Sequence, residues 1–543
     1  MDTSNRRENK LKDKVLYNAF ILDGKNKSKG YSATLYLKAR SVTHTLSPYD
    51  AYEVIRIDSQ DKTEDCSPES MREIIYSTDE NLKILNERAT SLGLLNPELE
   101  DVQHHPLTPE FLDFHEHSEF YSYFHPELDA KRRQRVRGSV LGNCGISVYP
   151  MVKGREELLM HSVLSTLGEW PKDESGKPIL WKDLDGFRNI LKERGVQNRL
   201  YFLTGHAALR IAAMDGNPNR EATDKEIDKM CGFLDEMISE GSIGFSTGLY
   251  YAPCVFASRK ELIELLKVVK KHNALFAVHM REEGNRVLES INEVIELSKE
   301  VGGLRLEISH LKAVGVKNQI KVDSMLSLIE KARFEGLDVM FDQYPYTYGS
   351  TSLFSLLPPS ALSLSDDELL KKIKDRTWRE KTKYEMLHPD HFESIAELCT
   401  FDNIYIQSLG NTKEYDRKSI NEIAKLRGDE DSFDTFFNLL LESKGLAVMR
   451  DTTTCDENLM KIYTHPLSIY ASDSLYAGTS WHERSTESTL EALRIAKRTG
   501  DWLSAVERMT SKGAKRISSD EVKYYTIDKG SIINFVDIYS LLN

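Results

Sequence analysis

The sequence predicts a closed (β/α)₈ barrel of the TIM type, and three observations support this fold class. Short apolar or β-branched runs alternate with amphipathic helical segments from about residue 108 onwards. The step from His279 to His310 is 31 residues, the length of one βα unit. Eight strand-like runs occur, and they end near His115, Asn143, His206, Thr247, His279, His310, Tyr344 and Asp473.

Residues 274–312 contain the clearest of these units. ALFAV and LRLEIS are expected to be buried strands, and each is followed by a histidine, His279 or His310. The amphipathic helix between them ends at Gly302 and Gly303, where glycine tolerates a left-handed turn. A right-handed crossover makes the two strands parallel, so their C-terminal ends point the same way. The two imidazoles are therefore expected to converge above the sheet.

A second helical segment, 258–271, has a sequence signal for its N-terminus. Ser258 and Glu261 have the spacing of a capping box, in which each side chain accepts a hydrogen bond from the backbone of the other residue. Apolar residues then recur at helical spacing as far as Lys271. A helix that begins after Ser258 is expected.

The other segments define the expected domain organisation. The polar residues 1–13 are expected to be a disordered start. Strand-like runs such as VLYNAFILDG predict a β-rich piece with a connecting segment over 14–107, and the runs VKYYTI and SIINFVDIYS of 519–543 are expected to rejoin it. The barrel is expected to span 108–518. It carries an inserted helical, lid-like segment at about 358–462, where the interval before the eighth strand is too long for one βα unit.

Composition and charge exclude several classes of function. The chain has 543 residues, of which 40% are hydrophobic and 29% charged, so it can bury a large core. Its net charge of −13 repels nucleic acid and anionic membranes, and neither is expected as a partner. No apolar run is long enough for a leader or a membrane span, so a cytoplasmic location is expected. The six cysteines form no CxxC pair, which argues against a disulfide framework or a zinc ribbon.

Side chains capable of metal chemistry follow several strands, at the barrel end where catalytic groups of this fold lie. In HEH, strand alternation places His115 and His117 on the same face, so both can bind one ion. The glycines of GNCGIS let the backbone bend so that the Cys144 thiolate points inward. Asp473, in SDS, can take a proton from water activated by a metal and deliver it to a leaving amine. Each motif alone is a weak signal, whereas their coincidence at strand ends supports a metal site.

The ordered motifs are FLDFHEHSEF, GNCGIS, GHAALR, IGFSTGLYY, VHMREEGNRVLE, ISHLKA, YPYTYGSTSL, SDS and HERS. Together they resemble the amidohydrolase superfamily, specifically its N-acyl-D-amino-acid deacylase (D-aminoacylase) branch. The resemblance runs from about residue 108 to the C-terminus, whereas residues 1–107 resemble the branch only at VLYNAFILDG. It implies zinc-dependent hydrolysis of the N-acyl amide bond of N-acyl-D-amino acids, which releases a carboxylic acid and a D-amino acid.

The resemblance also implies roles for individual residues. One tightly held zinc would be bound by Cys144, His279 and His310, and a second, weaker site would use His115 and His117. Asp473 would reach both metals as the catalytic acid and base. Tyr344 would donate a hydrogen bond to the carbonyl oxygen as it becomes an oxyanion. The substrate is a small molecule with a free carboxylate, and the residues assigned to its binding are Lys312, Arg484, Tyr344 and Ser350.

The chain departs from the family pattern at several positions. Glu110 stands where glycine usually precedes the first strand, and Glu119 stands where aspartate usually follows HxH. Ser474 replaces the glycine that usually follows the aspartate, and Ala207 and Ala208 lie within GHAALR. The proposed metal ligands and the acid/base residue are all present, so these departures bear more on substrate fit and rate than on metal binding. The number of metals in the cell, the acyl and side-chain preference and the oligomeric state are left open.

Two alternatives belong to other classes of function. The first is a cyclic amide hydrolase of the dihydroorotase or hydantoinase kind, which commonly bridges two metals with a carboxylated lysine on the fourth strand. The candidate fourth strand, GSIGFSTGLYY, contains no lysine, and Cys144 offers a compensating anion. The second is a non-catalytic relative that keeps the barrel and the metal. Such a protein has no need of an acid/base aspartate beside its metal ligands.

Overall fold

The computed structural model describes residues 11–25, 30–43, 48–59, 79–103, 105–364, 366–390, 392–410 and 412–542, so most of the predicted disordered start lies outside the described residues. The chain forms two compact units. The first comprises residues 1–112, 135–137 and 489–543, and the second comprises residues 113–134 and 138–488. Within the described residues, no helix combines the length and the apolar character needed to cross a membrane.

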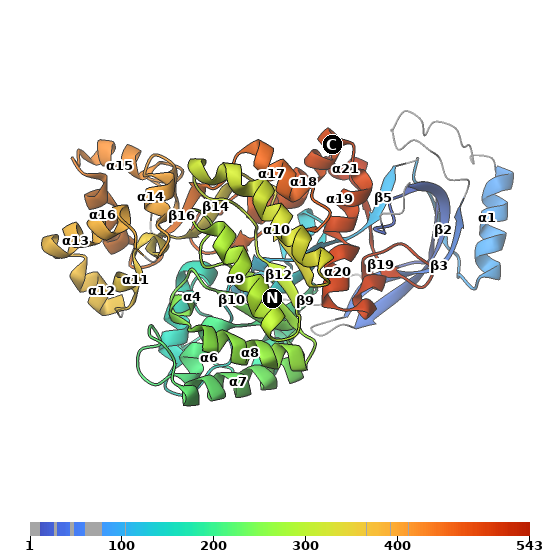
Figure 1. The fold of residues 1–543 in the computed structure, drawn as a ribbon. Coiled ribbons are helices and arrows are strands. Elements are labelled where there is room, and N and C mark those ends of the chain that lie inside the picture. The colour runs from blue at the N-terminus through green and yellow to red at the C-terminus, as the bar shows by residue number, and fades with distance from the viewer. Residues whose placement is uncertain are drawn as a thin grey trace. The chain divides into compact units, whose positions relative to one another are not determined.

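Eight strands form a nearly closed barrel in which successive strands are neighbours and run parallel (Figure 1). They are β6 (Phe111–Asp113), β8 (Val136–Leu141), β9 (Arg199–Gly205), β10 (Gly244–Gly248), β11 (Leu275–His279), β12 (Arg305–Ile308), β13 (Asp338–Gln343) and β17 (Ser468–Tyr470). The first and last strands approach each other where Phe114 N donates to Tyr470 O at 3.2 Å. The predicted (β/α)₈ barrel is confirmed, and all eight strands end within three residues of the predicted positions.

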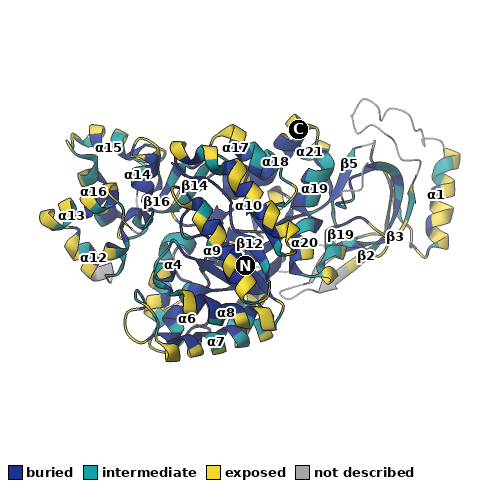
Figure 2. Cartoon of the chain, viewed as in Figure 1, coloured by how far each residue is buried: buried dark blue, intermediate teal, exposed yellow. Residues whose placement is uncertain are grey.

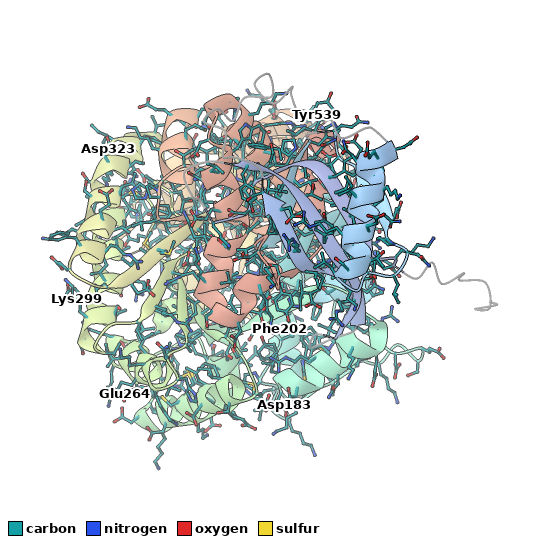
Figure 3. The ribbon with its side chains drawn as sticks, turned by 90° about the vertical axis from the view of Figure 1, so that its right-hand side faces the viewer. Asp183, Phe202, Glu264, Lys299, Asp323 and Tyr539 are labelled. Atoms are coloured by element: carbon teal, nitrogen blue, oxygen red, sulfur yellow. The ribbon has the colours of Figure 1, made fainter. Side chains whose placement is uncertain are left out.

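Amphipathic helices cover the outside of the barrel. They include α4 (Glu156–Leu167), α5 (Leu184–Arg194), α6 (His206–Ala213), α7 (Asp224–Ser239), α8 (Arg259–Lys271), α9 (Val287–Glu300), α10 (Val322–Phe334), α17 (Asp456–Tyr463) and α18 (Arg484–Thr499). Figure 2 shows their buried faces turned to the sheet and their exposed faces turned to solvent. Charged side chains such as Glu264 and Lys299 extend outward, whereas Phe202 on β9 is buried (Figure 3).

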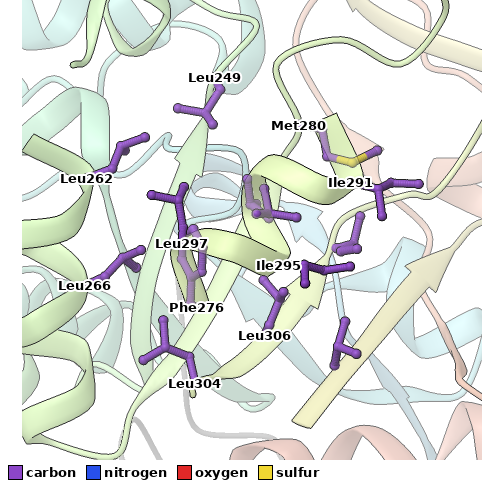
Figure 4. Packing of buried hydrophobic residues seen from close by; sticks show 14 of the residues in the cluster. Leu249, Leu262, Leu266, Phe276, Met280, Ile291, Ile295, Leu297, Leu304 and Leu306 are labelled. Carbon is purple, nitrogen blue, oxygen red and sulfur yellow. The ribbon is translucent and has the colours of Figure 1, made fainter. Parts of the chain in front are cut away.

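The βαβ unit anticipated at residues 274–312 forms the centre of the largest hydrophobic cluster. Leu262 and Ile291, from neighbouring helices, pack with Phe276 and Leu306 of the strands, and all four side chains are fully buried (Figure 4). Burying a Leu, Ile or Phe side chain contributes about 1.5–3 kcal/mol relative to exposure. This packing fixes the strands whose ends carry His279 and His310.

The predicted capping box at the start of α8 is half formed. Ser258 Oγ accepts a hydrogen bond from Glu261 N at 3.3 Å, as expected. The Glu261 carboxylate pairs instead with Arg210 and with His206 Nε2, the latter at 2.7 Å. A buried guanidinium is a stronger partner for a carboxylate than a backbone amide, so tertiary contacts override the local motif.

A separate helical segment occupies the interval between β13 and β17, as the sequence predicts. It begins with β14 (Tyr348–Ser352), which joins β16 (Val448–Thr452) and β15 (Ile404–Ser408) in an antiparallel sheet. Its helices are α11 (Pro359–Leu362), α12 (Asp366–Lys372), α13 (Arg376–Leu387), α14 (Ile395–Cys399), α15 (Ile420–Arg427) and α16 (Ser432–Ser443) (Figure 1). They enclose a hydrophobic core of their own, which includes Phe436, Leu440 and Met449.

The first unit contains a seven-stranded sheet. Its strands are β1 (Lys14–Ile21), β2 (Tyr31–Thr43), β3 (Pro48–Ser59), β4 (Glu98–Asp101), β5 (Pro106–Pro109), β19 (Ile532–Ile533) and β20 (Phe535–Asp537). The two C-terminal strands pair with β3 and β5, so the expected return of the C-terminal segment to the β-rich piece is confirmed. The same unit contains α1 (Asp79–Ser91), α19 (Trp502–Met509), α20 (Ser511–Ile517) and α21 (Ile538–Leu542).

The prediction of a strand at VKYYTI is wrong. The first half of this run belongs to a 3₁₀ helix, Ser519–Tyr524, and Tyr525 N donates to Val522 O at 3.0 Å, the i to i+3 bond of such a turn. The outer edge of β3 is already taken by β19. The buried side chains of Tyr525 and Ile527 therefore pack without joining the sheet.

Candidate active site

The HEH and SDS segments are joined by a short parallel pair of strands. In β7 (Glu116–His117) and β18 (Ser474–Leu475), Glu116 lies opposite Ser474. Just before this pair, Asp473 N donates to His115 O at 2.8 Å. These backbone contacts bring Asp473 Oδ1 to 3.5 Å from His115 Nε2 and 3.6 Å from His117 Nε2. The three residues form one compact group of donor atoms.

Cys144 lies beside this group, at a bend that the backbone can adopt only with glycine nearby. Cys144 has a left-handed φ of 53°, and the glycines on either side, Gly142 and Gly145, have φ of 80° and 77°. A Cβ atom at Gly142 would lie 2.1 Å from the carbonyl oxygen of Leu203. This bend turns the Cys144 thiol inward, as the sequence predicts for GNCGIS.

The Cys144 sulfur faces the histidines at the ends of β11 and β12. Its Sγ lies 3.9 Å from His279 Nδ1 and 3.4 Å from His310 Nε2, and those two nitrogens are 2.9 Å apart. His115 Nε2 is 3.3 Å from the same sulfur. Ligands bound tetrahedrally to one zinc lie about 3.3–3.8 Å apart. The separations of Cys144 from His115 and His310 lie in this range, whereas the two that involve His279 lie just outside it, so the donors are of the type, and close to the spacing, that a zinc ion needs.

The electrostatics of the site favour a thiolate at Cys144 and a neutral imidazole at His279, whereas nearby negative charge outweighs burial and raises the pKa of His115, His117 and His310, the last two to about 9. Burial opposes ionisation of the Cys144 thiol, but the adjacent His115 and His310 outweigh it and hold its pKa well below the ordinary value. Burial lowers the pKa of His279, which favours the neutral imidazole that binds metals. Burial also opposes ionisation of Asp473, yet the Arg484 guanidinium, with Nη1 2.8 Å away, holds the pKa of that carboxyl well below its usual range.

The predicted substrate-binding residues differ in how they reach the pocket beside these donors. Lys312, Tyr344 and Ser350 line it, together with His310 and Asp473. Among the described residues, none forms a hydrogen bond with the Tyr344 hydroxyl, although that oxygen is buried. A buried hydroxyl without a partner is available to a ligand.

Arg484 lies behind Asp473 and Tyr344 and does not line the pocket. Besides its ion pair with Asp473, its Nη2 donates to the Ser350 carbonyl at 2.9 Å, and its guanidinium lies 5.2 Å from the centre of the Tyr344 ring. In this arrangement Arg484 orients the candidate acid/base. Its predicted contact with the substrate carboxylate stays a prediction.

The structure adds residues that sequence reasoning missed. Glu283 is buried, its carboxylate lies 2.8 Å from Lys312 Nζ and 3.2 Å from His310 Nδ1, and it lines the same pocket. Asp342 supports the opposite histidine, with Oδ2 3.3 Å from His115 Nδ1. Carboxylates in such positions orient metal-binding imidazoles. The HMREEG motif does indicate a carboxylate near His279, but the sequence alone does not distinguish Glu283 from the adjacent Glu282 in this role.

Two of the departures from the family pattern lie next to the donors. Glu119 is buried, accepts from Gly142 N at 2.8 Å, and has a pKa that burial raises to about 7. Ser474 Oγ accepts from the buried Lys131 Nζ at 3.2 Å. The third, Glu110, pairs with Arg137 at 2.9 Å in the other unit. Glu119 and Ser474 therefore support the backbone that presents Cys144 and Asp473.

The fold and the site define a barrel with clustered metal-binding side chains, and comparison with known proteins finds relatives that are named D-aminoacylase and N-acyl-D-amino-acid deacylases. No family model matches the chain. Two curated relatives from Alcaligenes xylosoxydans xylosoxydans are a D-aminoacylase, 32% identical over 253 residues, and an N-acyl-D-glutamate deacylase, 33% identical over 261 residues. These matches cover 47% and 48% of this chain and 50% of each relative, so the chain spans about half the length of the curated relatives it matches. The resemblance found in the motifs is confirmed.

Two solved deacylase structures share the fold of this chain over nearly its whole length. An N-acyl-D-glutamate deacylase from Bordetella bronchiseptica, complexed with zinc and a phosphonate inhibitor, aligns with a TM-score of 0.72 and 22% identity, covering 97% of this chain and 90% of that one. A D-aminoacylase structure aligns with a TM-score of 0.67, again with 22% identity and the same coverage. At this identity the likeness establishes the fold.

Proposed function

We propose that this protein is a zinc-dependent hydrolase of the N-acyl amide bond of N-acyl-D-amino acids. The observation that carries the proposal is the convergence of one thiol, four imidazoles and one carboxylate beside a pocket that holds a lysine and an unpaired tyrosine hydroxyl. The names of the relatives support the same reaction class, since both act on N-acyl-D-amino acids according to those names.

Each group has a role in this reaction. Cys144, His279 and His310 would hold the tight metal, and His115 and His117 would form the weaker site, with Asp473 reaching both. When bound, zinc supplies Lewis-acid chemistry: it polarises the amide carbonyl and makes water more acidic. The Asp473 carboxylate takes the proton of the attacking water and returns it to the leaving nitrogen. The Tyr344 hydroxyl donates to the carbonyl oxygen as negative charge develops.

The type of amide bond that the protein is proposed to hydrolyse follows from positively charged side chains held at fixed positions. Lys312 lines the pocket and can bind a free α-carboxylate at a set distance from the metal ligands, and Arg484 contributes positive charge behind Tyr344. The scissile bond is then an N-acyl bond on an amino acid rather than an internal peptide bond. With carboxylate and carbonyl both held, only one enantiomer directs its side chain into the pocket, and the resemblance indicates the D form.

A panel of N-acetyl-D- and N-acetyl-L-amino acids, assayed for released amine with the zinc-loaded full chain, tests the proposal. We expect turnover of the D forms and little or none of the L forms. A hydantoin or dihydroorotate added to the panel tests the cyclic-amide alternative, which the absence of lysine in β10 (Gly244–Gly248) disfavours. Equal rates on both enantiomers, or turnover of cyclic amides alone, would contradict the proposal. No turnover of any amide would favour the non-catalytic alternative.

The proposed metal ligands give a second prediction. Purified wild-type protein should retain about one zinc per chain after dialysis, and His279→Ala should lose most of it, because a structural or catalytic zinc needs at least three protein ligands. Elemental analysis measures both. The matched control is His272→Ala, which removes a histidine that pairs with Asp235 on the outside of the barrel and should leave zinc unchanged. Full retention of zinc by His279→Ala would refute this ligand set.

A further inference from the structure

A second cavity, of about 160 Å³, adjoins the charged pocket at the donor cluster. His117, Cys144, His310 and Asp473 line its inner end. Asp473 and His310 also line the pocket that holds Lys312, so the two spaces meet at the candidate reaction centre. A substrate whose scissile amide lies between them extends one end into each.

The two spaces differ in charge. The first contains Glu283, Lys312, Glu393 and Asp451. The ionisable side chains of the second cavity gather at its inner end, and the wall away from the donors consists of apolar or hydroxyl side chains, among them Ile146, Ala207, Phe354, Leu362, Ser165 and Thr166. An ionised group placed there would lose its hydration without gaining a counter-ion. The second cavity therefore suits an uncharged, largely apolar group.

Its volume is larger than an acetyl group needs. An apolar cavity of roughly 150 Å³ binds a molecule as large as benzene. An acetyl methyl group would leave most of the present cavity to water, whereas a chain of about four to six carbons or an aromatic ring would bury apolar surface against Ile146, Phe354 and Leu362. The charged end of an N-acyl amino acid belongs in the other pocket, beside Lys312, so the acyl end is the part directed here.

We propose that this cavity is the acyl-binding site and that the preferred substrates carry an uncharged acyl group larger than acetyl. The inference rests on the proposed hydrolysis of N-acyl-D-amino acids and adds the class of acyl group. Each methylene that leaves water should raise kcat/KM by about fourfold while the chain still fits. Butanoyl and hexanoyl substrates should therefore exceed acetyl by about tenfold or more.

The test uses the zinc-loaded full chain and one D-amino acid acylated with acetyl, butanoyl, hexanoyl, benzoyl or succinyl groups. We expect kcat/KM to rise from acetyl to hexanoyl, to remain high for benzoyl and to fall for succinyl, whose second carboxylate would enter the uncharged cavity. A kcat/KM that is highest for acetyl and declines with length would overturn the inference and leave the proposed function standing. Failure to hydrolyse every member of the series contradicts the proposed function itself.

A variant tests whether the dependence of kcat/KM on acyl length arises in this cavity. Ser165→Phe, on α4, places a ring in the space and should lower the hexanoyl-to-acetyl ratio of kcat/KM by about tenfold. Leu158→Phe adds the same bulk on the exposed side of the same helix and should leave the ratio unchanged. If Ser165→Phe does not fold, the smaller Thr166→Leu serves the same purpose. An unchanged ratio in a folded, cavity-filling variant would show that the acyl chain binds elsewhere.

Discussion

Replacing Asp473 by asparagine is expected to lower kcat by about 10²-fold or more, the scale of a lost general acid/base. The amide has the shape of the carboxylate but cannot take a proton from water or return it to the leaving nitrogen. Asp473 lies 3.5 Å from His115 Nε2 and 3.6 Å from His117 Nε2, beside the proposed weaker metal position, and it lines the same pocket as His310 of the proposed tight one.

The variant should keep the fold with reduced stability, because the amide oxygen can accept a hydrogen bond from Arg484 but no longer neutralises that buried guanidinium. The link between Asp473 and His115 is a backbone hydrogen bond of 2.8 Å, which the substitution leaves in place. Steady-state kinetics with an N-acyl-D-amino acid measures the effect, and elemental analysis of the same sample shows whether the tight zinc is retained. Wild-type turnover by a zinc-loaded Asp473→Asn protein would remove this residue from the mechanism.

The barrel and the convergence of the donors were predictable because both follow from periodicity. In a parallel barrel the strand ends share one rim, so residues spaced by one βα unit, such as His279 and His310, meet without any knowledge of the intervening packing. Cys144 was predictable for a related reason. The glycines beside it indicate a sharp backbone bend, and such a bend turns the thiol inward.

Ion-pair partners were not predictable, because they depend on which charged side chain becomes buried. Glu282 and Glu283 are adjacent in sequence, yet Glu283 pairs with Lys312 in the pocket whereas Glu282 pairs with Arg286 at 3.1 Å. The same limit applies to Arg484, whose ion pair with Asp473 at 2.8 Å the sequence does not predict. Strand propensity also mispredicts structure where the available edge of a sheet is already paired with another strand, as at VKYYTI, because β19 occupies the outer edge of β3.

The clearest buried charge that the sequence conceals is Lys131. It lies in α3 (Asp129–Arg133), a run of charged residues, DAKRR, that resembles a solvated helix. The structure buries its ammonium group between the carboxylates of Asp113, at 2.8 Å, and Glu116, with Ser472 and Ser474 as further partners. This cluster holds Glu116, which lies between the two histidines of HEH. It also holds Ser472 and Ser474, which flank Asp473.

Lys131→Met is therefore expected to destabilise the protein by about 3–5 kcal/mol, because removing one partner of a buried ion pair leaves the other charges uncompensated. The adjacent Arg132→Met is the matched control. Arg132 is half exposed and pairs with Glu127 at 3.5 Å, and such a surface pair contributes about 0–1 kcal/mol. Urea unfolding followed by tryptophan fluorescence compares the two variants with the wild type.

The pH dependence of the loss identifies its cause. Without Lys131, burial and the nearby Asp113 carboxylate raise the pKa of Glu116 in the folded state further above its unfolded value, so the folded variant binds more protons than the unfolded chain. Stability then falls as pH rises through this range. The difference in the free energy of unfolding between Lys131→Met and wild type should be smallest near pH 5 and grow toward neutral pH. Adding Glu116→Gln to the Lys131→Met variant should recover part of the lost stability. A loss that is independent of pH and unaffected by Glu116→Gln would mean that Lys131 acts through packing alone.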